Sequence, residues 1–269
     1  MIRTAVIMAA GLGTRMRQAD DGAALNASQS VVAEAGVKGM IPIRRPFLEY
    51  VLSALADAGV DDVVLVIGPQ HEAIRRHFTV EAPPRRVRVR FAVQPEPIGT
   101  ANAVTTAATL VGAAPFLVLN ADNYYPVEAY RALAADDSAG TIAFDRETLG
   151  GEGNIDAERV RAFAVLTVTD DGYLAGIIEK PGEALDLASS AARWVGMNLW
   201  AVTPDIVDAC RRVPRSRRGE FELPEAVALA LRDGVRVRAI RMAAPVLDLS
   251  RRADVAVVAA RLGDIEPQP

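Results

Sequence analysis

Hydrophobic and polar positions along the chain predict strands and helices in turn. The apolar run "TAVIM" at residues 4–8 predicts a buried strand. Residues 47–59 place apolar side chains at helical spacing until Gly59 ends the helix. Further segments of both kinds follow, as predicted strands at 61–68, 86–94 and 115–123 and predicted helices at 71–78 and 99–111. Because strands that alternate with helices form βαβ units, this half predicts a mostly parallel sheet flanked by helices.

The second half of the chain changes to antiparallel signals. Residues 162–181 hold two strand-like runs on either side of "DDG", which is a hairpin turn sequence. A strand, two helices, a strand and a last helix follow, at 194–202, 205–212, 223–234, 235–242 and 253–263. Residues 18–37 are polar and alanine-rich with weak periodicity, so they predict a long loop. A loop of that length in a compact domain is usually functional or mobile.

Composition limits the classes of function. With 269 residues, of which 51% are hydrophobic, the chain can bury the core of one large domain. The net charge is only −4 and no aromatic residues interleave with the arginines, which argues against a nucleic-acid partner. The single cysteine, Cys210, excludes a disulfide framework, and the sequence has neither an apolar run of membrane length nor a signal-peptide pattern. We therefore expect a soluble cytoplasmic protein, with His71 and His77 on its surface.

The glycine-rich loop at residues 9–17, "AAGLGTRMR", follows the first predicted strand. A dinucleotide-binding fingerprint would need a third glycine where Met16 stands, and the Gly-Lys-Ser/Thr ending of a P-loop is also absent. Glycines let backbone N–H groups approach a ligand closely, and Arg15 and Arg17 can neutralise phosphate oxygens. The loop alone is therefore compatible with a phosphate site or with a structural turn.

This loop and the motifs after it resemble those of the sugar-1-phosphate nucleotidyltransferases, the nucleotide-sugar pyrophosphorylases. The matching segments, in the order of that family, are "GLGTR", "KGMIP", Gln94 with "PIGTANAV", "LNADN", "IEKP", "GMNLW", "GEFELPEAV" and "VLDL". The resemblance implies an α/β fold of the nucleotide-diphospho-sugar transferase type, with a Rossmann-like, mostly parallel sheet flanked by helices and an antiparallel sugar-binding part. It also implies one domain at residues 1–255, divided near residue 140 into nucleotide-binding and sugar-binding halves, followed by a helix end and tail at 256–269.

The resemblance further implies a reaction in which a sugar 1-phosphate attacks the α-phosphorus of a nucleoside triphosphate and pyrophosphate leaves. The second pKa of a phosphate monoester is about 6, so the attacking group is already an anion near neutral pH and needs no general base. Catalysis must then come from cations and from carboxylates that hold Mg²⁺. The residues implied to act on the phosphates are Arg15, Lys38 and Lys180. Those implied around the nucleotide are Ala10, Gly11, Gly13, Thr14, Gln94, Gly99 and Thr100.

Other positions are implied for the sugar and the metal ion. Those implied to hold the sugar phosphate are Asn123, Glu179, Gly196, Asn198 and Glu222. The implied Mg²⁺ ligands are Asp122 and Asp248. Asp122 ends a predicted strand, where ligands bind in open α/β sheets, although it could instead form an Asx turn. Asp248 could instead cap the helix that follows it.

Three departures from the family pattern keep an alternative open. Val37 stands where the family has proline, Ala121 where it has glycine, and Leu249 where a Gly-Thr turn is usual. They leave room for a non-catalytic, nucleotide-binding regulatory relative. The segment "GTANAV" slightly favours an ADP-forming enzyme over GDP- and UDP-forming ones, with glucose 1-phosphate or a related hexose or cyclitol phosphate as acceptor. We expect no nucleic-acid or membrane partner, and exposed apolar strands in the second half could form a homo-oligomer surface.

Overall fold

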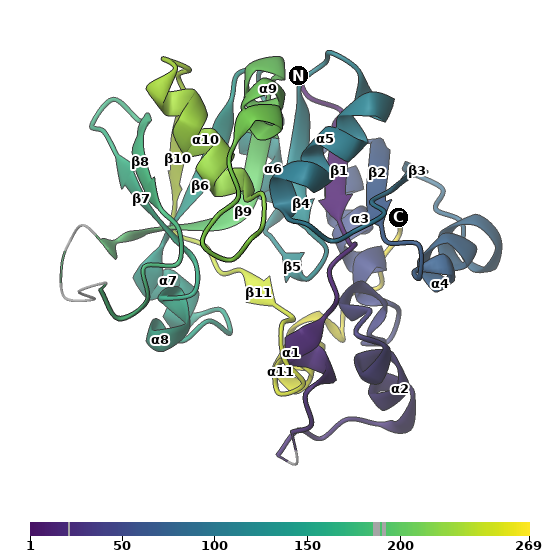
Figure 1. Ribbon diagram of the computed structural model, residues 1–269. Coiled ribbons are helices and arrows are strands. Elements are labelled where there is room, and N and C mark those ends of the chain that lie inside the picture. Colours follow the sequence, from purple (N-terminus) through teal and green to yellow (C-terminus); the bar gives the residue numbers. More distant parts are fainter. Residues whose placement is uncertain (21, 185–188, 190–191) are drawn as a thin grey trace.

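A twisted sheet organises the chain (Figure 1), in a computed structural model that describes residues 1–20, 22–184, 189 and 192–269. Within those residues the main path of the sheet has the order β10-β6-β9-β4-β1-β2-β3, and the hairpin of β7 and β8 joins it at β9. Its strands are β1 (Thr4–Met8), β2 (Asp62–Ile67), β3 (Arg88–Val93), β4 (Phe116–Asn120), β6 (Gly140–Asp145), β7 (Ala164–Val168), β8 (Leu174–Ile178), β9 (Trp194–Val202) and β10 (Arg238–Met242). A second, two-stranded sheet pairs β5 (Asn123–Tyr124) with β11 (Leu247–Asp248).

Helices cover both faces of the sheet. The α-helices are α1 (Thr14–Arg17), α2 (Ala27–Ala35), α3 (Phe47–Asp57), α4 (Glu72–Arg76), α5 (Thr100–Val111), α6 (Val127–Ala134), α7 (Arg146–Gly151), α8 (Ala157–Val160), α9 (Pro204–Arg212), α10 (Leu223–Arg232) and α11 (Asp254–Leu262). Shorter helical turns are η1 (Lys38–Met40), the π-helical η2 (His77–Glu81) and η3 (Gly182–Ala184). In the described part of the chain no helix is long and apolar enough to cross a bilayer.

The alternation of side chains along the central strands creates two cores. Ile7 of β1 packs with α3 and α6 on one face, whereas its neighbour Val6 packs with α5, α9 and α10 on the other. Successive residues of a strand point to opposite faces, so a strand covered on both sides must be apolar throughout. This explains the uninterrupted apolar runs of β1, β2 and β4 and confirms the predicted α/β fold class.

The antiparallel part enters the sheet through β9. This strand runs antiparallel to both β4 and β6 and so lies between the strands of the two halves of the chain. The predicted hairpin forms between β7 and β8, where Gly172 adopts a φ of 81° that suits glycine. Strand β11 returns from the end of the chain to pair with β5, directly beyond β4. Segments distant in sequence therefore meet beyond the carboxyl end of β4.

The expectation of a continuous loop at residues 18–37 is wrong in part. The segment contains α2, which begins with a capping box: the Asn26 side chain accepts from the Gln29 backbone, and the Gln29 side chain accepts from the Asn26 backbone. The helix buries only Gln29 and Ala33, so the hydrophobic period that identifies a helix is nearly absent. Local capping chemistry forms this helix where the apolar pattern is too weak to predict it.

Candidate active site

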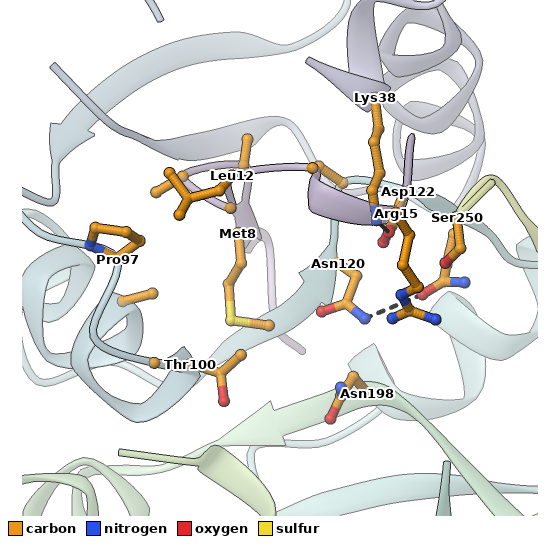
Figure 2. A pocket seen from close by; sticks show the side chains of 18 of the residues that line it. Met8, Leu12, Arg15, Lys38, Pro97, Thr100, Asn120, Asp122, Asn198 and Ser250 are labelled. Atoms are coloured by element: carbon orange, nitrogen blue, oxygen red, sulfur yellow. Dashed lines mark hydrogen bonds and ion pairs between the residues drawn. The ribbon is translucent and has the colours of Figure 1, made fainter. Parts of the chain in front are cut away.

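A cavity of about 400 Å³ lies beyond the carboxyl ends of β1 and β4 and is walled by both halves of the chain. The residues that the family resemblance implies for phosphate, nucleotide, sugar and metal all line it, whereas Arg17 of the glycine loop does not. Figure 2 shows Leu12, Met8 and Pro97 at one end and Lys38, Asp122 and Arg15 at the other. The individual roles of these residues stay predictions, but the structure brings their side chains to one place.

The glycine loop lies against the C-terminal end of α2. Gly13 has a φ of 62° at the start of α1, and a Cβ there would lie 2.7 Å from the carbonyl carbon of Gly36. Only glycine fits that position without displacing backbone. Arg15 is exposed at the cavity and has neither a hydrogen-bond nor an ion-pair partner within the described residues. Arg17 differs, because its guanidinium donates to the Ala35 carbonyl (2.8 Å) and so ties the loop to α2.

His71 lies behind this loop, and the expectation that it is a surface residue is wrong. Only 2% of it is exposed. Its Nδ1 accepts from the Gly68 backbone N–H (3.2 Å), which leaves the proton of the neutral ring on Nε2. Burial and the charge of Arg17 lower the pKa of His71, so the ring is neutral near pH 7. His71 therefore acts as a neutral support beneath the cationic loop.

Lys38 and Asp122 form an ion pair in the wall of the cavity. Lys38, in η1, places its Nζ 2.7 Å from Oδ2 of Asp122, which follows β4. Both side chains are about one-fifth exposed, at 18% and 19%. Oδ1 of Asp122 has no hydrogen-bond partner within the described residues, so it can accept a cation from the cavity. The pair puts one positive and one negative group side by side in the wall of the cavity.

A chain of hydrogen bonds runs along the floor beside Asp122. Asn120 donates to Oδ1 of Asn123 (3.1 Å), and Asn123 donates to Oδ1 of Asp248 (3.0 Å). The same Asp248 oxygen accepts from the Ser250 hydroxyl (2.9 Å), and its other carboxylate oxygen accepts from Arg159. Burial and the neighbouring Asp122 carboxylate raise the pKa of Asp248 to about 6, against the opposing charge of Arg159.

The two predicted metal ligands thus differ. Mg²⁺ favours a few carboxylates together with phosphate oxygens and retained waters. Asp122 fits such a site because one of its oxygens is open to the cavity. The described residues contain no group of three or more His, Cys, Asp or Glu side chains able to hold a metal ion, so the triphosphate would have to complete the coordination. Asp248 has both oxygens engaged by the chain itself, and its role as a ligand stays a prediction.

The opposite wall carries a cation between two carboxylates. Lys180 places its Nζ 2.9 Å from Glu179 and 3.1 Å from Glu222. Burial raises the pKa of Glu179 despite Lys180. Burial also opposes ionisation of Glu222, but Lys180 and the Ser216 hydroxyl outweigh it and lower the Glu222 pKa. Glu179 is therefore the more easily protonated of the two carboxyl groups.

Two non-glycine residues on this wall have a left-handed backbone. Lys180 has a φ of 45° and Asn198 a φ of 56°. Such conformations cost roughly 1–3 kcal/mol and gather at functional sites, where the surrounding structure enforces them. Asn198 also accepts from the buried indole of Trp200 (3.4 Å), which fixes its side chain in the middle of β9. Trp200 itself is 1% exposed and packs in the core.

At the far end of the cavity the amide of Gln94 has a fixed orientation. Its Nε2 donates to the Gly99 carbonyl (3.1 Å) and to Oδ1 of Asn102 (2.8 Å). Because a carbonyl only accepts, the Nε2 atom must face Gly99, and Oε1 is left as an acceptor. Thr100 accepts from the Leu223 backbone N–H (2.8 Å), which joins this end to α10.

Sequence reasoning missed several residues of the cavity. They are Met8, Leu12, Pro97, Asn120, Arg218, Glu220 and Ser250, together with Arg159 behind Asp248. Leu12, Pro97, Asn120 and Glu220 lie inside motifs that the sequence did identify. Met8, Arg218 and Ser250 lie directly beside one, so extending each motif by a residue or two would have found them. Arg159 has no such signal, because it stands 89 positions from Asp248 and in no recognised motif.

The fold and this cavity define a class of α/β protein whose ligand pocket lies at the carboxyl ends of the strands. The family model for nucleotidyl transferases matches residues 30–244, which is most of the chain. The chain therefore belongs to the nucleotidyl transferase family, which confirms the resemblance to sugar-1-phosphate nucleotidyltransferases.

Individual relatives and solved structures agree with this family. The UTP–glucose-1-phosphate uridylyltransferase AglF of Haloferax volcanii is 29% identical over 241 residues, covering 88% of this chain and 87% of its own. A glucose-1-phosphate thymidylyltransferase of Streptomyces antibioticus is 27% identical over 267 residues, covering 98% of this chain and 67% of its own. A mannose-1-phosphate guanylyltransferase of Drosophila pseudoobscura pseudoobscura is 29% identical, covering 66% of this chain and 44% of its own.

Two solved structures share the fold. A UDP-glucose pyrophosphorylase complexed with UDP-glucose superposes with a TM-score of 0.76 at 17% identity, covering 99% of this chain and 100% of its own. The UTP-bound enzyme of Acinetobacter baumannii has a TM-score of 0.75 at 22% identity, covering 100% of this chain and 96% of its own. At these identities the structures establish the nucleotide-diphospho-sugar transferase fold, which is the fold type expected from the sequence.

Proposed function

We propose that this chain transfers a nucleoside monophosphate from a nucleoside triphosphate to a sugar 1-phosphate, forming a nucleoside-diphosphate sugar and pyrophosphate. One observation carries the proposal: a single cavity holds cations on two facing walls. Arg15 and Lys38 lie at the glycine loop, and Lys180 lies on the sugar side. Two anions that must approach each other need positive charge behind both of them.

The reaction needs alignment and charge stabilisation rather than proton transfer. An oxygen of the sugar phosphate bonds to the α-phosphorus as the bond to the oxygen bridging the β-phosphorus breaks, and the electron pair leaves with pyrophosphate. Lys180 orients the attacking phosphate, while Arg15 neutralises the departing pyrophosphate. Magnesium held by Asp122 would neutralise the triphosphate and polarise the α-phosphoryl group. With Mg²⁺ on Asp122, the Nζ of Lys38 would be available to the α-phosphate.

The fixed amide of Gln94 supports a base with a ring N–H donor. Uracil, thymine and guanine carry an N–H on their pairing edge, whereas adenine and cytosine present a ring nitrogen acceptor there. The free acceptor Oε1 of Gln94 can bond that ring N–H, whereas with adenine or cytosine it can bond only an exocyclic amino group beside a ring nitrogen that is left unpaired. We propose uracil or thymine, in keeping with the relatives named for uridylyl and thymidylyl transfer, in place of the slight preference for adenine drawn from "GTANAV".

The test is a panel of five triphosphates against several sugar 1-phosphates, read by pyrophosphate release. We expect UTP or dTTP to give the highest kcat/KM, and ATP or CTP at least about tenfold less, because a mismatched polar edge is left unpaired. A preference for ATP would overturn the proposed choice of uracil or thymine as the base. Asp122→Asn should abolish turnover while leaving the fold intact.

The same panel separates the enzyme from a non-catalytic relative. Binding of triphosphate by calorimetry, without pyrophosphate release from any pair, would show a regulatory nucleotide-binding protein instead. Wild-type-like turnover in Asp122→Asn would remove the metal-binding role from that residue. Glucose 1-phosphate is the first acceptor to test, with other hexose and cyclitol phosphates after it.

A further inference from the structure

Asp248 is held by its own chain on every side. Oδ1 accepts from Asn123 (3.0 Å) and Ser250 (2.9 Å), and Oδ2 accepts from the Arg159 guanidinium. Its backbone is clamped as well, because the Asn154 side chain accepts from the Asp248 N–H (2.8 Å) and donates to the Asp248 carbonyl (2.7 Å). Only 2% of Asp248 is exposed. The positive charge of Arg159 and several hydrogen bonds therefore already stabilise the Asp248 carboxylate.

Arg159 is itself fixed. It belongs to α8, and its side chain is only 10% exposed. Nη1 donates to Oδ1 of Asp254 (2.7 Å) and to the Asn154 carbonyl (2.8 Å). Asp254 in turn accepts from the backbone N–H groups of Ser250 and Arg251, at 2.9 and 2.7 Å. Moving the guanidinium away would leave two buried carboxylates unpaired, which is strongly unfavourable.

Asp122 has the opposite character. Its side chain is 19% exposed, one oxygen is free, and its partner is a lysine. An ammonium on a flexible stem can leave its partner for a phosphate more easily than a buried, bidentate guanidinium can. A divalent ion arriving between Asp122 and Asp248 would meet an available ligand on one side. On the other side it would meet a fixed positive charge.

We propose that Arg159 is a resident cation at Asp248 and a positioning residue of the site. It keeps Asp248 as an anchor that orients Asn123 and the β5–β11 pair, so that the divalent ion has Asp122 as its protein carboxylate. The proposal rests on the proposed function, since it takes the metal-assisted transfer as given. It departs from the two-aspartate site that the sequence resemblance implies.

The experiment measures metal binding without turnover. Mn²⁺ replaces Mg²⁺ as a probe visible by electron paramagnetic resonance, and the triphosphate carries a methylene group between its α- and β-phosphorus atoms so that it cannot react. Asp122→Asn should weaken Mn²⁺ binding by about tenfold or more, as expected for loss of a ligand. Asp248→Asn, which keeps its carbonyl acceptor and leaves Arg159 paired with Asp254, should weaken it by less than about threefold.

A second variant tests Arg159 itself. The double substitution Arg159→Gln/Asp254→Asn removes one charge of each sign, so the net charge of the buried region is unchanged while Asp248 loses its cation. We expect Mn²⁺ to bind about tenfold more tightly to this variant, with a changed resonance spectrum, because Asp248 becomes available as a ligand. The single variant Arg159→Lys keeps the positive charge beside Asp248 and should bind Mn²⁺ with wild-type affinity.

Two results would overturn the proposal. One is an equal loss of Mn²⁺ affinity in Asp248→Asn and Asp122→Asn. The other is an unchanged affinity and spectrum in the folded double variant, with folding checked by circular dichroism. Failure of the proposed function is a different observation, namely that wild-type protein releases no pyrophosphate from any pair of substrates. Because the Mn²⁺ measurement uses an unreactive triphosphate, its outcome does not depend on that result.

Discussion

Two glycines at the ends of α5 offer a matched pair of substitutions. Gly99 (φ 122°, ψ 170°) precedes the helix and Gly112 (φ 82°, ψ −148°) follows it, both in extended positive-φ backbone. Alanine in either place incurs a conformational cost of about 1–3 kcal/mol. The surroundings differ, since a Cβ on Gly112 would meet no atom within 4 Å, whereas one on Gly99 would lie 2.6 Å from the Phe221 backbone nitrogen.

The difference between the two variants measures the contact with Phe221. Displacing that backbone would break two hydrogen bonds of 2.8 Å, from Ala101 to the Phe221 carbonyl and from Phe221 to the Ile98 carbonyl. At about 0.5–1.5 kcal/mol each they add about 1–3 kcal/mol to the cost of Gly99→Ala alone. For a domain of this size that excess corresponds to a melting temperature about 2–12 °C below that of Gly112→Ala.

Activity should separate the pair further. Phe221 precedes Glu222, which contacts Lys180, so a shifted Phe221 would displace Glu222 and Lys180 in the wall proposed to hold the sugar phosphate. We expect kcat/KM for the sugar phosphate to fall about tenfold to a hundredfold in Gly99→Ala, and to stay near wild type in Gly112→Ala. Urea unfolding and pyrophosphate release measure the two effects. Equal stability and equal kinetics in the two variants would refute the close packing of Gly99 on Phe221.

Three further outcomes follow from the charged groups. Arg15→Met should raise KM for the triphosphate about tenfold to a hundredfold, as loss of a charge-assisted hydrogen bond predicts. The same change at exposed Arg261 should have no effect on this KM. Equal KM values in the two variants would contradict the role of Arg15. Lys180→Met should raise KM for the sugar phosphate by a similar factor and leave triphosphate binding by calorimetry unchanged. His71 has a pKa lowered by burial and by Arg17, so below about pH 6.5 the unfolded chain binds a proton that the folded chain does not, and stability falls as pH falls. The free energy of unfolding of His71→Gln should fall less between pH 7 and pH 5.5 than that of the wild type, and parallel curves would show that His71 does not titrate on unfolding.

Much of the fold could be read from periodicity. The runs around β1, β2 and β4 are apolar throughout because both faces are covered, and the structure has strands there. The insertion of β9 between β4 and β6 could not be read, because an antiparallel strand chooses its partners by long-range packing rather than by local pattern. Helix α2 was missed because its capping box lacks an accompanying apolar stripe.

Residues of the site could be predicted where they stand in a recognised motif. Contacts between residues that lie far apart in the sequence could not be predicted. Glu222 and Lys180 both stand in motifs, yet their contact spans 42 positions and follows from the fold. The same holds for Arg159 and Asp248, which no spacing rule connects. The polar neighbours of His71 predict a surface position, but its ring is buried and accepts from the Gly68 backbone N–H, a contact that the local pattern does not indicate.

Hydrogen bonds from two backbone N–H groups connect the elements around the cavity, and they limit how far two bound anions could push those elements apart. The Leu249 N–H donates to the Asp122 carbonyl (2.8 Å), so the β11 segment is fixed to the end of the cavity at Asp122. At the base end, the Leu223 N–H donates to the Thr100 hydroxyl (2.8 Å), fixing α10 to α5. Repulsion between the two phosphates would push the walls apart, and these ties resist that motion at both ends. Geometry set before binding then supplies part of the stabilisation that free cations in water would have to gain by reorganising.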